Sequence, residues 1–599
     1  MSITKKELRS VLKSLYPSSR EDFGRKLHDI ISVYKNKRPN SLKKWDKRIE
    51  KLWYKQNNNI MYILYADLFN CDDKEGDKLK GLINRLNYLK ELGVTNIHIL
   101  PCLKNSGDAG FAVDSYRDID YRIGTINDFK RLTNEAHKKG IMITFDLVLN
   151  HTSDKHKWAK KLKAGSKKYR NYYIIDETKT GKSWEKVIDI FPEFAPGHWD
   201  YIPEIDEYVW ATFYSRYPFK GKKYNDFSQW DLNYRNPDVL LGMIENILFL
   251  ANCGVDVFRF DAIPHMWKEK GTDCFSSPQV YKVIQIFRYA LEKAAPKSAI
   301  LVEACVGIKQ LNKYFNNGNT AQLAYDFILM PALWYSMIKK ESVSLKKVLN
   351  RRRKIPDYCE WITFDVNHDE VSFLTLGEIF KGRDGIEATR YLFRNLTSKD
   401  KGIPFRFKPK IDKYGNAVSG TKWSLLGGDI AKGGKDKSVV VKKIMLMNAF
   451  KLSVGGIPQF YQGEELGLSN NYAYKDNPIK KMDSRFIKRL EITDKMRQKR
   501  KQEGTRENEI FNKLKKLISI RKKYNIFGNG KFKLLKSNKY MLCFERKNKN
   551  EKLLVLINFL NKKQKYYLNS DYKDIIHSAT LKRGNLTIGA YEFRWLCKD

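Results

Sequence analysis

The chain has 599 residues, which is too long for one hydrophobic core of ordinary size, so several domains are expected. Hydrophobic residues make up 42% of the chain and aromatic residues 13%, which excludes disorder as its main state. Lys and Arg number 112 against 68 Asp and Glu, a formal net charge of +44. Because the basic residues are spread along the whole chain, we expect a lysine-rich surface and no nucleic-acid partner, with a polyanion-binding face as the alternative.

Targeting and redox signals are weak. Eight cysteines are scattered without a Cys-x-x-Cys pair, as is typical of reduced, buried thiols. The first residues lack the hydrophobic core of a signal peptide, and the most apolar long segment, 239–258, is interrupted by four polar residues. We therefore predict a cytoplasmic protein with no membrane partner, and its oligomeric state stays open.

Residues 1–57 are charged and carry apolar residues at helical spacing, which predicts a helical N-terminal domain. Strands and helices alternate after it. Strands are expected at 61–69, 96–101, 143–151, 255–261, 300–303, 323–329, 359–369 and 457–461, and helices at 77–92, 126–139, 239–251, 279–293, 331–340, 345–350, 444–452 and 511–524. This order is typical of a parallel sheet with crossover helices, and eight strands predict an α/β fold with a (β/α)8 TIM barrel.

Two long stretches interrupt the alternation. Residues 151–230 are rich in Lys, Tyr, Trp, Gly and Pro, and we expect an inserted domain that projects from the third strand over the active-site face. Residues 370–440 are expected to form a second, irregular insertion, and alternating runs after 526 predict a C-terminal antiparallel β domain. The expected domains are 1–57 (helical), 58–150, 231–369 and 441–525 (barrel), 151–230 (inserted), 370–440 (second insertion) and 526–599 (β domain).

The strand Gly254-Val-Asp-Val-Phe-Arg-Phe-Asp261 ends on two charged residues. Arg259 and Asp261 are two positions apart, so they share one face of the strand. A buried carboxylate needs charge compensation, which Arg259 can supply. On this strand alone, a structural ion pair and a catalytic carboxylate are equally good interpretations.

Other expected strands end on similar residues, namely His151, Glu303 and Asp369. In a (β/α)8 barrel the chemistry lies at the carboxyl ends of the strands, so we expect these groups to share one site. Two carboxyl groups about 5 to 5.5 Å apart suffice for retaining chemistry at a glycosidic bond. We expect Arg259 to keep Asp261 ionised as the nucleophile and burial to raise the pKa of Glu303 toward that of a working acid.

Four segments carry a resemblance to a known family: Asp146-Leu-Val-Leu-Asn-His151, residues 254–261, Glu303 and Asn367-His-Asp369. They resemble, in order and spacing, the four signature regions of the α-amylase superfamily, glycoside hydrolase family thirteen, and the likeness spans roughly residues 59–599. The resemblance implies that Asp261 is the nucleophile, Glu303 the general acid/base and Asp369 the transition-state stabiliser. It also implies sugar-binding residues, which are His151, Arg259 and His368.

Within the superfamily the chain is most similar to the amylosucrases, in stretches such as 228–237 and 483–485. This resemblance implies sucrose or a related α-glucoside as donor and an α-glucan or water as acceptor. It implies a salt bridge between Asp108 and Arg485 that closes the donor pocket, and Phe111 in the place of a stacking Tyr. The loop after the second strand lacks the Asn and Asp donors of the superfamily's calcium site, so we predict no metal and no cofactor.

Two departures leave the acceptor open. Ile188 stands where an Arg of the acceptor region is expected, and Glu370 stands where an Asp usually follows the stabiliser. We therefore predict a retaining, amylosucrase-like glucosyltransferase, with a sucrose hydrolase, a sucrose phosphorylase, an isomer-forming enzyme or another α-glucosidase of the superfamily as alternatives. A non-catalytic protein that binds glycans or polyanions is a more distant alternative.

Overall fold

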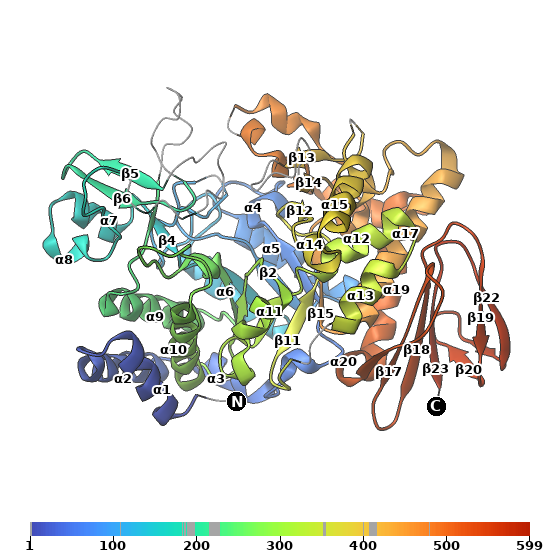
Figure 1. Ribbon diagram of the computed structural model, residues 1–599, viewed down its shortest axis with the longest axis horizontal. Helices are drawn as coiled ribbons and strands as arrows, with labels where there is room; N and C mark the ends of the chain where they lie inside the picture. Colours follow the sequence, from blue (N-terminus) through green and yellow to red (C-terminus); the bar gives the residue numbers. More distant parts are fainter. Residues whose placement is uncertain are drawn as a thin grey trace.

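The computed structural model describes residues 3–107, 109–181, 184, 187, 198–214, 228–351, 355–398, 400–405, 416–478 and 480–598. Its centre is a closed barrel of eight parallel strands (Figure 1). The strands are β1 (Met61–Leu64), β2 (Asn96–Ile99), β3 (Met142–Val148), β8 (Val257–Asp261), β9 (Ala299–Val302), β10 (Leu323–Tyr325), β11 (Glu360–Thr363) and β15 (Ile457–Tyr461). They pair in chain order, and β15 closes the ring against β1. The predicted (β/α)8 barrel is confirmed.

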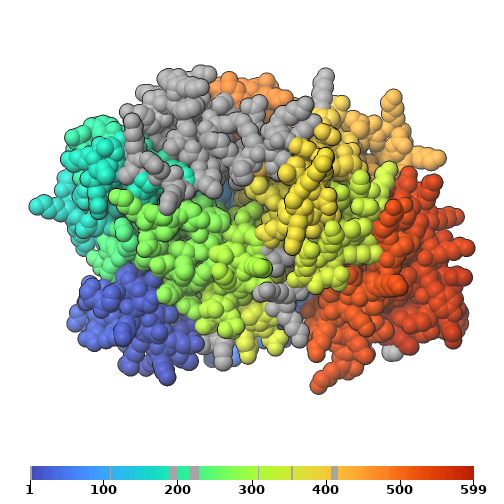
Figure 2. Space-filling view, in the orientation of Figure 1, coloured from blue at the N-terminus to red at the C-terminus, as the bar shows by residue number. Residues whose placement is uncertain are grey.

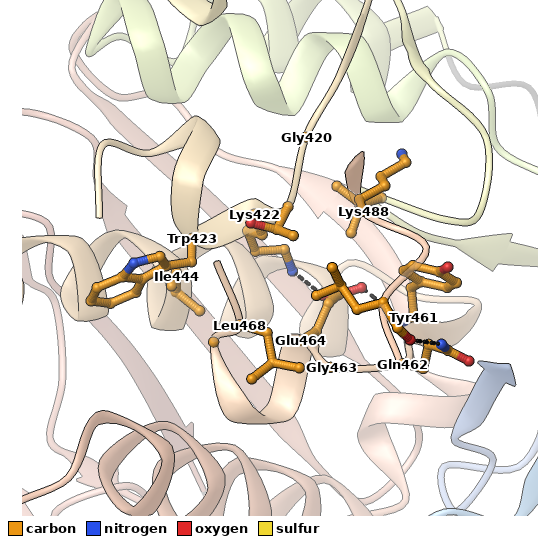
Figure 3. Close-up of a pocket in the computed structure, with 14 residues that line it drawn as sticks. Gly420, Lys422, Trp423, Ile444, Tyr461, Gln462, Gly463, Glu464, Leu468 and Lys488 are labelled. Atoms are coloured by element: carbon orange, nitrogen blue, oxygen red, sulfur yellow. Dashed lines mark hydrogen bonds and ion pairs between the residues drawn. The ribbon is translucent and has the colours of Figure 1, made fainter. Parts of the chain in front are cut away.

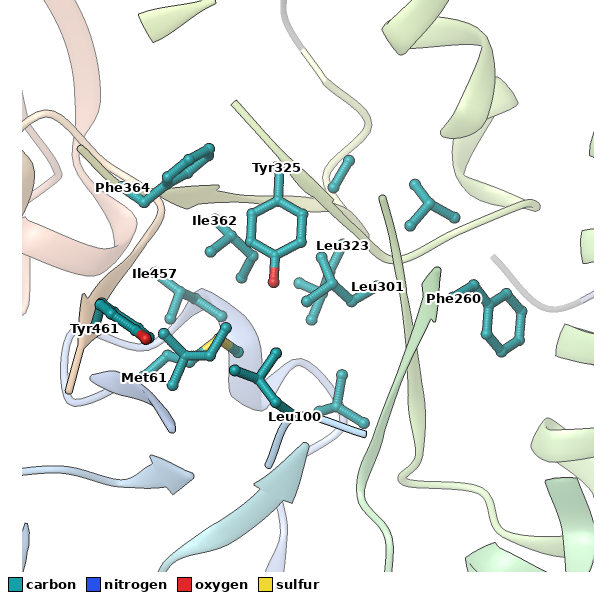
Figure 4. Close-up of a cluster of buried hydrophobic side chains, with 14 of the residues drawn as sticks. Met61, Leu100, Phe260, Leu301, Leu323, Tyr325, Ile362, Phe364, Ile457 and Tyr461 are labelled. Carbon is teal, nitrogen blue, oxygen red and sulfur yellow. The ribbon is translucent and has the colours of Figure 1, made fainter. Parts of the chain in front are cut away.

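The barrel strands are buried over nearly their whole length, because the sheet encloses side chains and helices cover its outside. Figure 4 shows Met61, Leu301, Ile362 and Ile457, from four different strands, packed together in the barrel. Side chains of β8 alternate: Phe260 packs outward on Phe287 of the following helix, at a ring distance of 5.4 Å. The residues on either side of Phe260 therefore face the barrel interior.

The helices that cover the barrel lie close to the predicted ones. They are α5 (Lys78–Leu92), α6 (Ile126–Lys138), α9 (Pro237–Asn252), α10 (Pro278–Ala294), α12 (Leu329–Lys339), α13 (Val343–Arg351), α17 (Gly433–Ser453) and α19 (Arg506–Lys523). Local signals set their ends. Thr125 and Asp128 form a capping box at the start of α6, and Asn236 caps α9 with Pro237 at its first position.

Several predicted strands are too long; the strand expected at 359–369, for example, ends at Thr363. Two others are followed directly by helical residues. The strand expected at 61–69 ends at Leu64, and Ala66–Phe69 forms the single turn α4, which the Asn70 amide closes by donating to the carbonyl of Ala66 at 2.8 Å. The strand expected at 323–329 ends at Tyr325, because the Asp326 carboxylate accepts from the backbone N–H of Leu329 and starts α12. Alternating apolar residues do not distinguish a short strand from a strand followed by a buried turn.

The N-terminal helices α1 (Lys5–Leu15), α2 (Arg20–Asn36) and α3 (Asn40–Arg48) lie at one end of the molecule, blue in Figures 1 and 2. α1 and α2 pack on α10, and α2 also contacts α9. Trp45 of α3 donates to the Asp256 carboxylate at 2.7 Å and stacks on His137 of α6 at 4.2 Å. His137 is thus a buried residue at the contact between α3 and α6.

The insertion after β3 is small and partly regular. A two-stranded ribbon, β4 (His151–Ser153) with β7 (Gln229–Asp231), forms its base. Its outer part carries the short helices α7 (Lys157–Lys163) and α8 (Lys167–Arg170) and the hairpin β5 (Trp199–Ile202) and β6 (Glu207–Trp210), at the upper left of Figure 1. The ribbon continues directly from the carboxyl end of β3, so the insertion is anchored at the site face of the barrel.

The second insertion is not irregular, which corrects the prediction for 370–440. Its described residues contain a three-stranded sheet and a long amphipathic helix, α15 (Arg383–Leu396), and α17 begins eleven residues before its predicted start at 444. The sheet strands are β12 (Val371–Ser372), β13 (Ile403–Phe405) and β14 (Ala417–Ser419). The buried residues of α15 recur at helical spacing, whereas frequent Gly, Arg and Lys disguise the pattern.

The C-terminal region is antiparallel β, as predicted. A six-stranded sheet is accompanied by a two-stranded ribbon, red in Figure 1. The sheet contains β16 (Lys531–Leu534), β17 (Met541–Lys547), β18 (Lys552–Asn558), β20 (Tyr572–Asp574), β21 (Ala579–Leu581) and β23 (Phe593–Lys598), and the ribbon contains β19 (Gln564–Leu568) and β22 (Gly584–Ile588). Within the described part of the chain, no helix has the length and hydrophobicity of a membrane span.

A buried group of four charges ties the end of β11 to its neighbours. Asp365 lies 2.7 Å from the ammonium of Lys422 and 2.8 Å from that of Lys451. Glu464, which follows β15, pairs with both lysines. All four side chains are buried, and the two Lys ammoniums lower the pKa of Asp365 to about 2 in spite of its burial.

Replacing Asp365 by Asn is expected to destabilise the protein by about 3 to 5 kcal/mol at neutral pH, because it leaves one carboxylate, Glu464, to compensate two buried ammonium groups. The pKa of Asp365 lies below its unfolded value of 3.8, so its contribution is complete above about pH 4 and is lost as the pH falls toward 2. Urea unfolding of both proteins at several pH values measures this difference. A gap between wild type and D365N that stays constant down to pH 2 would contradict the ion-pair account.

Candidate active site

The barrel interior at the end of β8 holds Arg259 and Asp261. Parallel pairing places Asp146 of β3 beside Arg259 and Val148 beside Asp261. The Arg259 guanidinium donates to Asp146 at 2.8 Å and forms an ion pair with Asp261. Asp146 also bonds His98 of β2 at 3.2 Å, so the buried His98 supports Arg259 through Asp146.

Glu303 follows β9 and lies beside Asp261. Its carboxylate accepts a hydrogen bond of 2.8 Å from the backbone N–H of Ala262, and its other oxygen lies 3.8 Å from Arg259. Ala262 has a φ of +49°, an uncommon conformation for a residue with a side chain, and this turn aims its N–H at Glu303. One guanidinium therefore lies close to both carboxyl groups, which come from adjacent barrel strands and face the same part of the barrel interior.

Asp369 follows β11 and is held by cations. Arg485 Nη1 lies 3.1 Å from its carboxylate, and Arg489 lies 3.9 Å away. His368 Nε2 lies 3.2 Å from the other carboxylate oxygen. Glu370, which replaces the usual Asp, is buried beside this group. The three carboxylates expected from the sequence are thus gathered at the carboxyl ends of β8, β9 and β11.

The predicted sugar-binding residues surround the same point. His151 donates from Nε2 to the carbonyl of Phe111 at 3.2 Å, and its Nδ1 accepts from Asn150 at the same distance. These partners define a neutral tautomer, and burial lowers the pKa of His151 to about 4. The rings of Phe111 and His368 are nearly parallel, 6.3 Å apart. Among the described residues, Nδ1 of His368 has no hydrogen-bond partner, whereas its Nε2 lies 3.2 Å from the Asp369 carboxylate.

The carboxylates have different acidities. Burial raises the pKa of Asp261, and neighbouring carboxylates add to this, while Arg259 opposes it. Burial likewise raises the pKa of Glu303. Burial acts in the same direction on Asp369, but His368, Arg485 and Arg489 outweigh it and hold its pKa far below the ordinary range.

These shifts bear on the predicted roles of the two acids. Burial and the nearby acids raise the pKa of Asp261, and the Arg259 guanidinium opposes them. Asp261 and Glu303 therefore titrate as a coupled pair. The direct contact of Arg259 with Asp261, against 3.8 Å to Glu303, favours Glu303 as the carrier of the shared proton.

Asp108 and Ile188 lie outside the described residues. The salt bridge between Asp108 and Arg485 therefore stays a prediction. Arg485 itself pairs with Asp483 at 2.8 Å and with Asp369. It therefore lies at the site, as expected of a residue that closes one end of a donor pocket.

The sequence did not identify several residues that build the site. Lys268 pairs with buried Asp231 at 2.7 Å, and Asn150 bonds both, which fixes the residue before His151. The hydroxyl of Tyr65 at the end of β1 has no hydrogen-bond partner in the described part of the chain, and its ring lies edge-on to His368 at 6.0 Å. A polar residue at the end of a barrel strand is the signal that could have indicated Tyr65. Over the described ranges, no cluster of His, Cys, Asp and Glu fits a metal ion.

Comparisons with known proteins agree with this geometry. The family model for the alpha amylase catalytic domain matches residues 56–419. The chain is 27% identical over 539 residues to trehalose synthase of Thermus thermophilus, which covers 85% of this chain and 51% of that protein. The chain therefore spans about half the length of that relative. It is 25% identical over 623 residues to glucosylglycerate phosphorylase of Spirochaeta thermophila, which covers 98% of each.

Solved structures show the same fold. Sucrose 6F-phosphate phosphorylase from Thermoanaerobacter thermosaccharolyticum matches with a TM-score of 0.67 at 22% identity, over 88% of this chain and 98% of that one. Isomaltulose synthase from Erwinia rhapontici matches with a TM-score of 0.65 at 20% identity, over 91% and 99%. Together with the match to more than half of the chain, these findings establish that the chain belongs to the α-amylase family.

Proposed function

We propose that the chain is a retaining enzyme that transfers a glucosyl unit from sucrose or a related α-glucoside. The observation that carries this proposal is the shared contact of Arg259 with Asp261 and Glu303 at adjacent strand ends. A carboxylate pair of this kind performs double displacement when the two groups lie close together. The proposed acceptor is an α-glucan, as in amylosucrases, with water as the alternative.

In the proposed mechanism, Asp261 attacks the anomeric carbon while Glu303 protonates the departing oxygen. A β-glucosyl ester forms on Asp261, and the leaving sugar, fructose when sucrose is the donor, is released. Glu303 then removes a proton from the acceptor, which displaces Asp261 and restores the α configuration. Asp369 stays ionised and binds sugar hydroxyls while positive charge develops on the ring.

The donor pocket is proposed to hold one glucosyl unit. Phe111, whose ring is nearly parallel to that of His368, is proposed to supply an aromatic face for the sugar, and His151 and His368 are proposed to contact its hydroxyls. Arg485, with Asp108 as its proposed partner, would close the far end. A closed end favours a short donor such as a disaccharide over the interior of a long glucan.

Phosphorolysis is the second candidate. It is favoured by the comparison with glucosylglycerate phosphorylase, because that likeness covers 98% of both chains, whereas the trehalose synthase is about twice the matched length. In this case inorganic phosphate would replace the sugar acceptor and accept the glucosyl unit from Asp261. The carboxylate chemistry would be unchanged.

One set of incubations separates these activities. Purified protein is given sucrose, trehalose or glucosylglycerate, with glycogen, with phosphate or with neither, and the products are quantified. Polymer growth with release of fructose supports the glucosyltransferase, glucose 1-phosphate supports the phosphorylase, and free glucose supports a hydrolase. If no donor is consumed under any condition, the proposed function is wrong.

Replacing Glu303 by Gln is expected to lower kcat/KM on sucrose by about 10²- to 10⁴-fold, since it removes the proton donor. An aryl α-glucoside with an acidic phenol needs little protonation, so its first step should be affected much less. The raised pKa of Glu303 keeps the wild-type acid protonated toward higher pH, and kcat/KM should fall as the pH rises through that pKa. Equal losses on both donors would exclude Glu303 as the acid.

A further inference from the structure

One short segment after β15 supplies three cations to the loop that carries Asp369. Arg485 lies in the turn η8 (Ser484–Ile487), and Lys488 and Arg489 follow it. Arg485 pairs with the Asp369 carboxylate, Lys488 donates to the Asp369 carbonyl, and Arg489 Nε donates to the His368 carbonyl at 3.3 Å. We call these three residues the cation clamp. The clamp fixes both the side chain and the backbone of Asp369.

We propose that Lys488 is a positioning residue that sets the orientation of Asp369, an inference that rests on the proposed function. The role differs from that of Arg485, since Lys488 contacts the backbone of the Asp369 loop and Arg485 contacts the carboxylate itself. Arg485 was expected from the sequence because of the resemblance, whereas Lys488 was not.

The surroundings of Lys488 direct its ammonium to this contact. The residue is 1% exposed and borders a cavity of about 20 Å³, which it shares with Tyr461, Gln462 and Glu464. Figure 3 shows its aliphatic stem against this cavity and its nitrogen turned away from Glu464. Burying an ammonium is costly unless polar groups compensate it. The groups at hand are the carbonyl of Asp369 and the Asp369 and Glu370 carboxylates.

The opposite end of the loop is held independently. Asp365 is fixed by Lys422 and Lys451, as described above, and the backbone N–H of Asp369 donates to the Asn367 side chain at 3.0 Å. This network holds the start of the loop, and the contacts that hold residues 368 and 369 come in addition to it. Lys488 and Arg489 make these contacts by binding two successive carbonyl groups.

Glu370 makes this arrangement particular to the chain. Burial raises its pKa to about 7, and burial lowers the pKa of Lys488 to about 8. A longer Glu in place of the usual Asp, opposite a Lys, forms a coupled pair next to the stabiliser. The carboxylates that act on the Lys488 ammonium are those of Glu370 and Asp369. Their charge therefore agrees with the contact between Lys488 and the Asp369 carbonyl.

The test compares Lys488→Met and Lys488→Arg with the wild type and with Lys495→Met, a matched change at an exposed residue of the nearby helix α18 (Asp494–Gln498). K488M is expected to lower kcat by about 10- to 100-fold with KM within about twofold, since a small displacement of Asp369 weakens the transition state more than the substrate complex. K488R, which retains a cationic donor, should recover most of kcat. K495M should match the wild type.

The affinity for a protonated iminosugar, measured by titration calorimetry, is a second readout. A loss of fold stability alone does not change this affinity in the folded protein. K488M should bind this cation more weakly than wild type by a factor similar to its loss in kcat, because both depend on Asp369. A folded K488M with wild-type kcat and iminosugar affinity would overturn the inference. Should K488M fail to fold, K488R carries the test, and a folded K488R with kcat below a tenth of wild type would overturn it. If the wild type consumes no donor, the proposed function is wrong. The iminosugar affinities of wild type and K488M then test by themselves whether Lys488 positions Asp369.

Discussion

Replacing Asp261 by Asn is expected to lower kcat/KM for the α-glucoside donor by about four orders of magnitude, because the amide cannot form the glucosyl ester. The substitution is nearly isosteric, and Arg259 keeps its bond to Asp146, so the fold should be retained. Initial rates on sucrose or an aryl α-glucoside, together with circular dichroism and thermal unfolding, measure the effect.

Asp256→Asn is the matched control. Asp256 lies immediately before β8 at the other end of the same strand, where it bonds Trp45, His137 and the backbone of Ile143. This substitution should lower stability and leave kcat of the folded protein unchanged. Activity in D261N within tenfold of the wild type would contradict the assignment of Asp261 as nucleophile.

Replacing Arg259 by Met is expected to destabilise the protein by about 3 to 5 kcal/mol and to abolish activity, because three carboxyl groups lose their common buried cation. Arg259 is 2% exposed and contacts Asp146, Asp261 and Glu303. Without it, these acids should take up protons at higher pH than in the wild type. Urea unfolding at neutral pH measures the loss of stability.

Arg25→Met provides the comparison for this loss. Arg25 forms only a surface ion pair with Asp22, and its side chain is 74% exposed. Its removal should not shift the unfolding midpoint measurably. If R259M were as stable as R25M, the three carboxylates would not depend on Arg259 for their burial, and the electrostatic account of the site would be wrong.

The sequence predicts the barrel well because its signals are strong and local. Strands such as 255–261 are rich in Val and Phe, and helices such as α6 and α9 carry clear caps. The four signature segments fix the order of strand ends, so Asp261, Glu303 and Asp369 could be named before the structure was known. Their convergence follows from the barrel itself.

The remaining features depend on long-range packing or on weaker local signals. α15 begins after Gly382 and contains Gly385, which weakens its helical signal, and its apolar face is buried against the neighbouring helices α12 and α14 (Leu376–Ile379). The pKa of Asp261 depends on acids from three other parts of the barrel as well as on the adjacent Arg259, so its direction could not be inferred from one strand. Lys488 becomes significant only because the segment after β15 crosses the loop after β11.

The central claim is that Asp261 forms a covalent glucosyl ester with retention of configuration. The most direct measurement is mass spectrometry of peptides from protein treated with a slow-turnover fluorinated α-glucosyl fluoride, in wild type and E303Q. We expect one added fluoroglucosyl unit on the peptide that contains Asp261, and α-configured products by NMR. A label on a different residue, or a β-configured first product from an α-glucoside, would contradict the account.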